Sequence, residues 1–108
     1  MAVLVDPLRS YDRPQLPTSW WCHMAADGSF EELHRFAERL GIPRRRFQGD
    51  HYDLPPWLRS DAVRLGTEPV STAELLLRMA GPRGERARAR RAARASRRAS
   101  ADAPRPCA

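Results

Sequence analysis

The chain has 108 residues, 42% of them hydrophobic, and a formal net charge of +6, which suits one domain with a modest core. The charge is uneven. Residues 1–80 carry ten Arg against eleven acidic residues, whereas residues 81–108 carry nine Arg against two. We therefore expect a domain over residues 1–80 and a basic tail over residues 81–108.

The apolar run at the start is too short for a signal peptide, and no run is long enough to span a membrane. Cys22 and Cys107 give no disulfide framework. These features predict a cytoplasmic protein without a membrane partner.

Three short segments are typical of strands. The first is AVLV at residues 2–5, and the second is the aromatic-rich SWWCHM at residues 19–24. The third is EPVS at residues 68–71. Three prolines between residues 7 and 18 predict a loop there.

Three segments are typical of helices. Ser29 with Glu32 forms a capping box, and apolar residues then recur at helical spacing as far as residue 40. Adjacent prolines at residues 55 and 56 suit the start of a second helix. Ser71 with Glu74 forms another capping box and opens a third helix over residues 72–80. Because this third helix is apolar around most of its circumference, it should be buried on more than one side, and dimerisation through it would achieve that.

Strands that alternate with helices predict an α/β fold. We expect a small, at least partly parallel sheet of about three short strands, packed by three helices. The tail is rich in Arg and Ala and contains no larger apolar residue before Cys107. Such a segment cannot bury enough surface to fold alone, so we expect it to be disordered, or an extended helix when it lies on a polyanion.

The arginines of the tail are candidates for non-specific contact with nucleic-acid phosphates. The candidates are Arg86, Arg90, Arg91, Arg94, Arg97 and Arg98. No aromatic residue lies among them, so sequence-specific recognition is not expected. The alternative is that the tail is an extension with no selected role.

The order of motifs resembles a known family. The motifs are VLVDP near the start, WCHMAAD (21–27), EELHRFAERLGIPRRRFQGDHYDLP (31–55) and EPVSTAELL (68–76). Together they are similar to domain-of-unknown-function family number four thousand and thirty-one, found in small proteins of high-GC bacteria and their phages. The resemblance covers residues 2 to about 80 and implies no reaction, substrate or cofactor.

Histidines and carboxylates gather at the expected ends of strands, where parallel α/β sheets bind ligands. His23 and Asp27 follow the second strand, and His51 and Asp53 lie in the loop before the second helix. Such ligands suit a divalent ion such as Zn²⁺, Mn²⁺ or Fe²⁺, and His51 is the first candidate. Further ligand candidates are Asp6, Asp50 and Tyr52.

Structural roles compete with metal binding at these positions. Asp6 could cap a turn, Asp27 could cap the first helix, and Asp53 could cap the second. His34 falls at the boundary of the apolar stripe of its helix, where a local hydrogen bond is the more common role. Cys22 and His23 are neighbours on a strand, so their side chains should point to opposite faces and not form a catalytic pair.

Two functions of different classes remain open. The first is a domain that binds a ligand or a divalent metal, with hydrolysis of a phosphate ester as its reaction. The second is a non-catalytic interaction module that contacts nucleic acid through its tail or forms a homodimer through its third helix.

Overall fold

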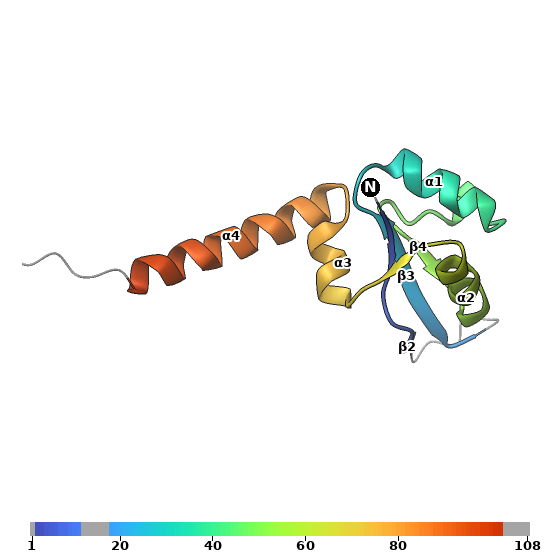
Figure 1. The fold of residues 1–108 in the computed structure, drawn as a ribbon, viewed down its shortest axis with the longest axis horizontal. Coiled ribbons are helices and arrows are strands. Elements are labelled where there is room, and N and C mark those ends of the chain that lie inside the picture. The colour runs from blue at the N-terminus through green and yellow to red at the C-terminus, as the bar shows by residue number, and fades with distance from the viewer. Residues whose placement is uncertain (1, 12–17, 103–108) are drawn as a thin grey trace, which may run out of the picture.

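Residues 2–11 and 18–102 are described by the computed structural model, and within them the chain is an α/β protein with five strands and four helices (Figure 1). The strands are β1 (Val3–Val5), β2 (Arg9–Ser10), β3 (Trp20–Ala26), β4 (Tyr52–Leu54) and β5 (Glu68–Pro69). The helices are α1 (Phe30–Arg39), α2 (Pro56–Arg64), α3 (Thr72–Arg78) and α4 (Pro82–Asp102), and a short 3-10 turn covers Arg44–Arg46. Among these described helices, none has both the length and the apolar composition needed to cross a membrane.

The sheet is mixed. β1 pairs with β5 in parallel, which confirms the expectation of a partly parallel sheet. β3 pairs antiparallel with β1, β2 and β4. The expected count of about three strands was wrong, because β2 and β4 are only two and three residues long. Strands this short give little alternation to detect, and both lie close to prolines that favour a loop.

The caps of α1 and α3 follow the sequence closely. The Ser29 hydroxyl accepts a hydrogen bond from the backbone N–H of Glu32 at 3.2 Å, and Ser71 does the same for Glu74 at 3.1 Å. Each bond satisfies a backbone donor that has no partner within its own helix. α2 begins at Pro56, as the adjacent prolines predict.

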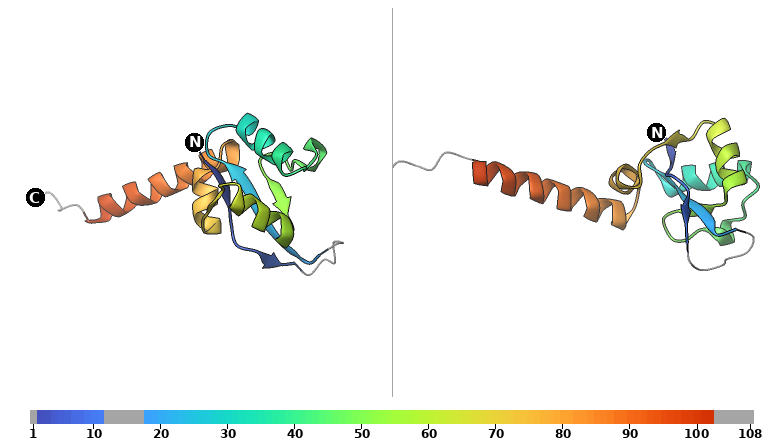
Figure 2. Two further views of the ribbon diagram at one scale, coloured as in Figure 1. Left: turned by 45° about the vertical axis from the view of Figure 1, so that its right-hand side comes forward. Right: turned by 90° about the horizontal axis from the view of Figure 1, so that it is seen from below.

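Helices cover both faces of the sheet (Figure 2). α1 and α2 pack on one face, and the core there contains the following buried residues: Val3, Val5, Cys22, Met24, Leu33, Phe36, Ala37, Tyr52, Leu54 and Ala62. α3 packs on part of the other face, where the buried residues are Leu4, Ala25, Leu75 and Met79. The face under α3 therefore has a smaller apolar cover, and part of it is left for polar side chains.

α4 leaves the domain as a single projecting helix, which gives the molecule a longest extent of 66 Å (Figure 1). Its first turns pack on α3. Ala87 is buried, and the Arg88 guanidinium donates to the carbonyl oxygens of Leu77 and Met79 at 3.1 and 3.0 Å. The sequence predicts disorder for the basic tail alone, but the structure gives an extended helix from Pro82 as far as Asp102. Ala and Arg are good helix formers, and packing on α3 holds the base of the helix. Residues 103–108 lie outside the described residues.

Candidate metal centre

The register of the sheet places four polar side chains on one face. His23 lies directly opposite Asp53 in the antiparallel pair of β3 and β4. Residues paired in this way share a face, and so do residues two apart on one strand. His51 precedes Asp53 by two, and Asp6 follows β1 beside His23, so all four belong to the face under α3. Their neighbours in sequence, including Cys22 and Tyr52, face the core on the other side.

Asp6 holds His23 in a defined orientation. One oxygen of its carboxylate accepts the His23 backbone N–H at 2.6 Å, and the other lies 2.8 Å from Nδ1 of the imidazole. The Thr72 hydroxyl donates to this second oxygen at 2.9 Å. Burial raises the pKa of Asp6, but these hydrogen bonds outweigh it and hold the pKa below its ordinary value. The ionised carboxylate can only accept, so Nδ1 of His23 carries the proton and Nε2 is free to bind a ligand.

His51 lies between two carboxylates. Its Nδ1 is 2.7 Å from Asp50, and its Nε2 is 3.1 Å from Asp53. Burial lowers the pKa of His51, but the hydrogen bonds to Asp53 and Asp50 outweigh burial and raise the pKa above its ordinary value. When His51 is protonated, a proton on Nε2 therefore bridges His51 and Asp53 in the metal-free chain. A metal ion can replace that proton, because both atoms are metal ligands.

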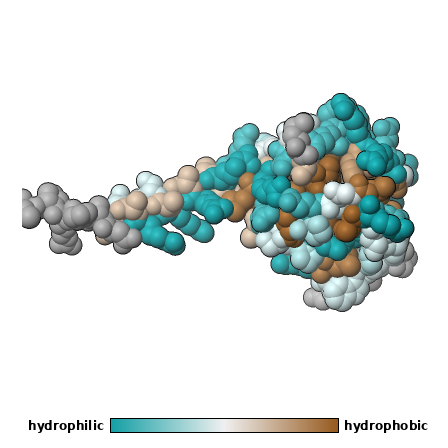
Figure 3. Space-filling view, viewed as in Figure 1, coloured by the Kyte–Doolittle hydropathy of each residue, from teal (hydrophilic) through white to brown (hydrophobic). Residues whose placement is uncertain are grey.

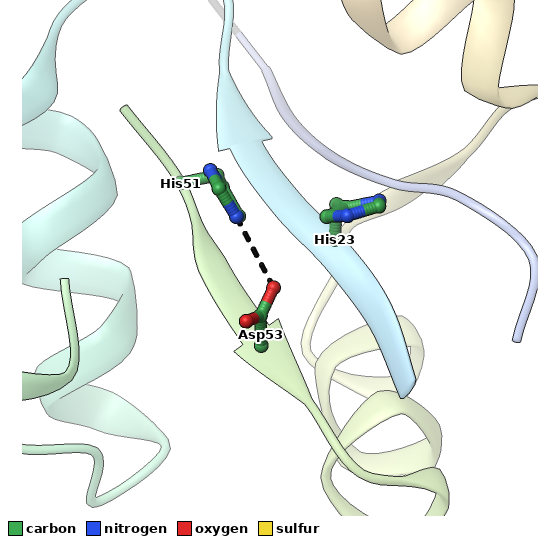
Figure 4. Close-up of side chains that lie close together, drawn as sticks. All are labelled: His23, His51 and Asp53. Atoms are coloured by element: carbon green, nitrogen blue, oxygen red, sulfur yellow. Dashed lines mark ion pairs between the residues drawn. The ribbon is translucent and has the colours of Figure 1, made fainter. Parts of the chain in front are cut away.

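The potential ligand atoms of His23, His51 and Asp53 lie within 4.8 Å of one another (Figure 4). The imidazole centroids of the two histidines are 5.1 Å apart. Ligand atoms at about 2.1 Å from a tetrahedral ion lie about 3.4 Å from one another. The three side chains would therefore need to move closer by about 1 to 1.5 Å to bind one ion together. Two imidazoles and one carboxylate form a recurrent set for Zn²⁺ and Fe²⁺ that leaves coordination positions open for water or substrate.

A pocket of about 400 Å³ opens beside this set. It is lined by the three ligand candidates and by Tyr11, Trp21, Arg46 and Gln48. The guanidinium of Arg46 can pair with an anion, and the rings of Tyr11 and Trp21 offer flat apolar surfaces. The pocket therefore combines potential metal ligands with groups suited to an anionic ligand that carries a ring.

Asp27 is not part of this cluster. Its carboxylate accepts the backbone N–H of Ala2 at 2.7 Å and pairs with Arg78 at 3.2 Å. The sequence reasoning assumed that the first two predicted strands are parallel, but β3 runs antiparallel to β1. The carboxyl end of β3 therefore lies beside the start of β1, at the opposite end of the sheet from Asp6.

The structure also decides the expected roles of the other residues that the sequence singled out. Tyr52 is buried on the opposite face, where its hydroxyl lies 2.8 Å from Nδ1 of His34. His34 thus remains outside the cluster, as predicted. Asp53 does not cap α2, because it lies in β4 and the cap residue is Pro55. Cys22 points away from His23, and burial raises the pKa of its thiol to about 12.

Several residues around the site were missed by the sequence reasoning. Thr72 was assigned only to its helix, and Arg83, whose Nε lies 3.2 Å from Asp50, was assigned only to the tail. Neither has a local sequence signal for this role. Trp21 could have been found, because it lies two residues before His23 and therefore on the same face of the strand.

A family model described as "Protein of unknown function (DUF4031)" matches residues 3–81. The chain belongs to the DUF4031 family. The matched region contains His23, His51 and Asp53 and ends one residue before α4 begins. Searches of curated proteins and of solved structures give no match for this DUF4031 chain.

Proposed function

We propose that the DUF4031 domain binds one divalent transition-metal ion through His23, His51 and Asp53 and uses it to hydrolyse a phosphate ester. One observation carries the proposal. Each of the two histidines has its Nδ1 against a largely buried carboxylate, and potential ligand atoms of both histidines and of Asp53 lie within 4.8 Å of one another. Carboxylates in this position fix the tautomer and orientation of histidines that bind metals.

Structural roles alone explain this arrangement less well. A histidine that only supports the fold needs one satisfied partner, as His34 has in Tyr52. Here two histidines and Asp53 meet at the wall of an open pocket, and the side chain of His23 remains 31% exposed. Leaving ionisable groups at a solvent-filled pocket is typical of a binding site.

The phosphate ester is suggested by the rest of the pocket. A bound ion would supply a water molecule acidic enough to act as hydroxide near neutral pH. Arg46 lines the pocket and is suited to bind the phosphate oxygens in two places at once. As the oxygen of the hydroxide bonds to phosphorus, the ester P–O bond breaks and the leaving oxygen takes a proton from solvent.

The test combines metal content with hydrolysis of bis(p-nitrophenyl) phosphate by the full chain. Wild type should hold one metal ion per chain and release p-nitrophenol, whereas His23→Ala and His51→Ala should lose both properties. His34→Ala is the matched control, because it removes the third histidine of the chain without touching the pocket. Wild type without metal after incubation with Zn²⁺, Mn²⁺ and Fe²⁺, or equal activity in all variants, would refute the proposal.

A second candidate function is a non-catalytic interaction module. The exposed arginines of α4 favour it as a contact for nucleic acid. Dimerisation through α3 stays a prediction. Within the chain, the sheet buries Leu75 and α4 contacts the C-terminal end of this helix, so part of its apolar surface is already covered.

A further inference from the structure

α4 has a charged face that the proposed metal chemistry does not use. When successive residues are turned by 100°, seven arginines fall within an arc of about 140°. They are named here the arginine face: Arg83, Arg86, Arg90, Arg91, Arg94, Arg97 and Arg98. The other side of the helix carries mainly Ala and Ser. Figure 3 shows this division, with hydrophilic side chains along one side of the projecting helix and more apolar ones along the other.

The arginine face begins at the candidate metal centre. Arg83, in the first turn of α4, pairs with Asp50 through its Nε at 3.2 Å, and Asp50 in turn contacts Nδ1 of His51. The packing of Ala87 and Arg88 on α3 fixes the base of the helix in this position. The face therefore runs continuously from solvent to the residues that orient a metal ligand.

Beyond Arg83, the arginines of this face form no ion pair within the part of the chain that the structure describes. Beyond Arg88, every α4 residue as far as residue 101 is exposed, and no acidic residue lies between Glu85 and Asp102. From Arg83 to Arg98 the helix rises about 22 Å, so its arginines can lie against several successive phosphates of a nucleic-acid strand. Such a polyanion can relieve the repulsion between the arginines.

We infer that the substrate of the metal centre is single-stranded nucleic acid, whose phosphates lie along the arginine face while one nucleotide enters the pocket. This rests on the proposed function. The pocket favours a single strand because Tyr11 and Trp21 line it, and the bases of a single strand leave their faces open to stack on aromatic rings. The arginine face carries no aromatic residue, so it binds without reading sequence.

The test compares two triple variants of the full chain that change the net charge equally. R90E/R94E/R98E reverses exposed residues of the arginine face, and R35E/R39E/R64E reverses exposed residues on α1 and α2, on the far side of the sheet. Each protein is loaded with metal and its metal content is measured. Binding and cleavage of a single strand of about 15 nucleotides are then followed between about 50 and 200 mM salt.

The variant of the arginine face should bind the strand at least about tenfold more weakly. Its plot of log affinity against log salt should also lose about two units of slope, since each lost phosphate contact removes about 0.7. Its cleavage of the strand below saturation should fall with affinity, whereas the α1/α2 variant should stay within about twofold of wild type. If both variants hold metal and match wild type, or if a duplex is preferred, the inference is wrong and the proposed function stands. If no protein holds metal, both are wrong.

Discussion

Replacing Asp6 with Asn tests how the site prepares His23 for a metal. Asn has nearly the same shape, and its carbonyl can still accept the His23 backbone N–H that Asp6 accepts at 2.6 Å. Its NH₂ group then faces Nδ1 of His23, which the Asp6 carboxylate approaches at 2.8 Å. Because two donors cannot bond to each other, the imidazole must move its proton to Nε2. That proton occupies the position that a metal would take.

The expected losses of metal affinity and of folding stability follow from the hydrogen bonds that the Asp6 side chain makes. Returning the proton to Nδ1 in order to bind a metal would leave two donors facing each other, at a cost of about 1 to 3 kcal/mol. This corresponds to a loss of about 5- to 150-fold in metal affinity, which spans the range of about 10- to 100-fold for residues that orient metal ligands. The free energy of unfolding should fall by about 2 kcal/mol, because three hydrogen bonds to a charged carboxylate are replaced by contacts with a neutral amide.

The assay is competition with a metal-binding dye, paired with urea unfolding of the metal-free protein. Asp61→Asn is the matched control, because it makes the same change in an exposed surface ion pair of α2 and should alter stability by less than about 0.5 kcal/mol. A folded Asp6→Asn protein with wild-type metal affinity would refute the role assigned to Asp6.

Three further predictions concern protonation, packing and the thiol. The pKa of His51 is raised in the folded chain, so protonated His51 should stabilise the fold fully below about pH 6.5. This contribution to the free energy of unfolding should fade as the pH rises through the raised pKa, which urea unfolding of the metal-free protein can follow. A metal must displace the same proton, so metal affinity should rise about tenfold per pH unit below that pKa; a flat profile would contradict this. Gly84→Ala should free α4 from α3 and increase the amide hydrogen exchange of α4, because an added Cβ would overlap the carbonyl oxygen of Met79; unchanged exchange would show that the helix tolerates the substitution. Cys22, 1% exposed and with a thiol pKa of about 12, should resist iodoacetamide at pH 8 until the chain unfolds, and fast alkylation of the native protein would be inconsistent with the structure.

The helices were predictable because their signals are local. The cap at Ser29 and the proline at residue 56 act within one turn of their own helices. The direction of β3 was not predictable in this way, because antiparallel pairing with β1 depends on contacts between segments about 20 residues apart. This single feature decides that Asp6, and not Asp27, lies beside His23.

Part of the site was also predictable, for a different reason. His51 and Asp53 are two residues apart, so any extended conformation places them on one face, whether or not the strand is recognised. Arg83 could not be found, because its contact with Asp50 depends on how α4 packs on α3. Local spacing therefore places His51 and Asp53 on one face, whereas the pairing of His23 with Asp53 and the contact of Arg83 with Asp50 come from tertiary packing.

The most direct test of the central claim is the X-ray absorption spectrum of the full chain loaded with one equivalent of Zn²⁺. We predict a first shell of nitrogen and oxygen only, at about 2.0 to 2.2 Å, with the outer-shell scattering of two imidazoles. His51→Ala should reduce the imidazole signal or abolish binding, and His34→Ala should leave the spectrum unchanged. Sulfur scattering at about 2.3 Å, or a chain that binds no zinc, would contradict the account.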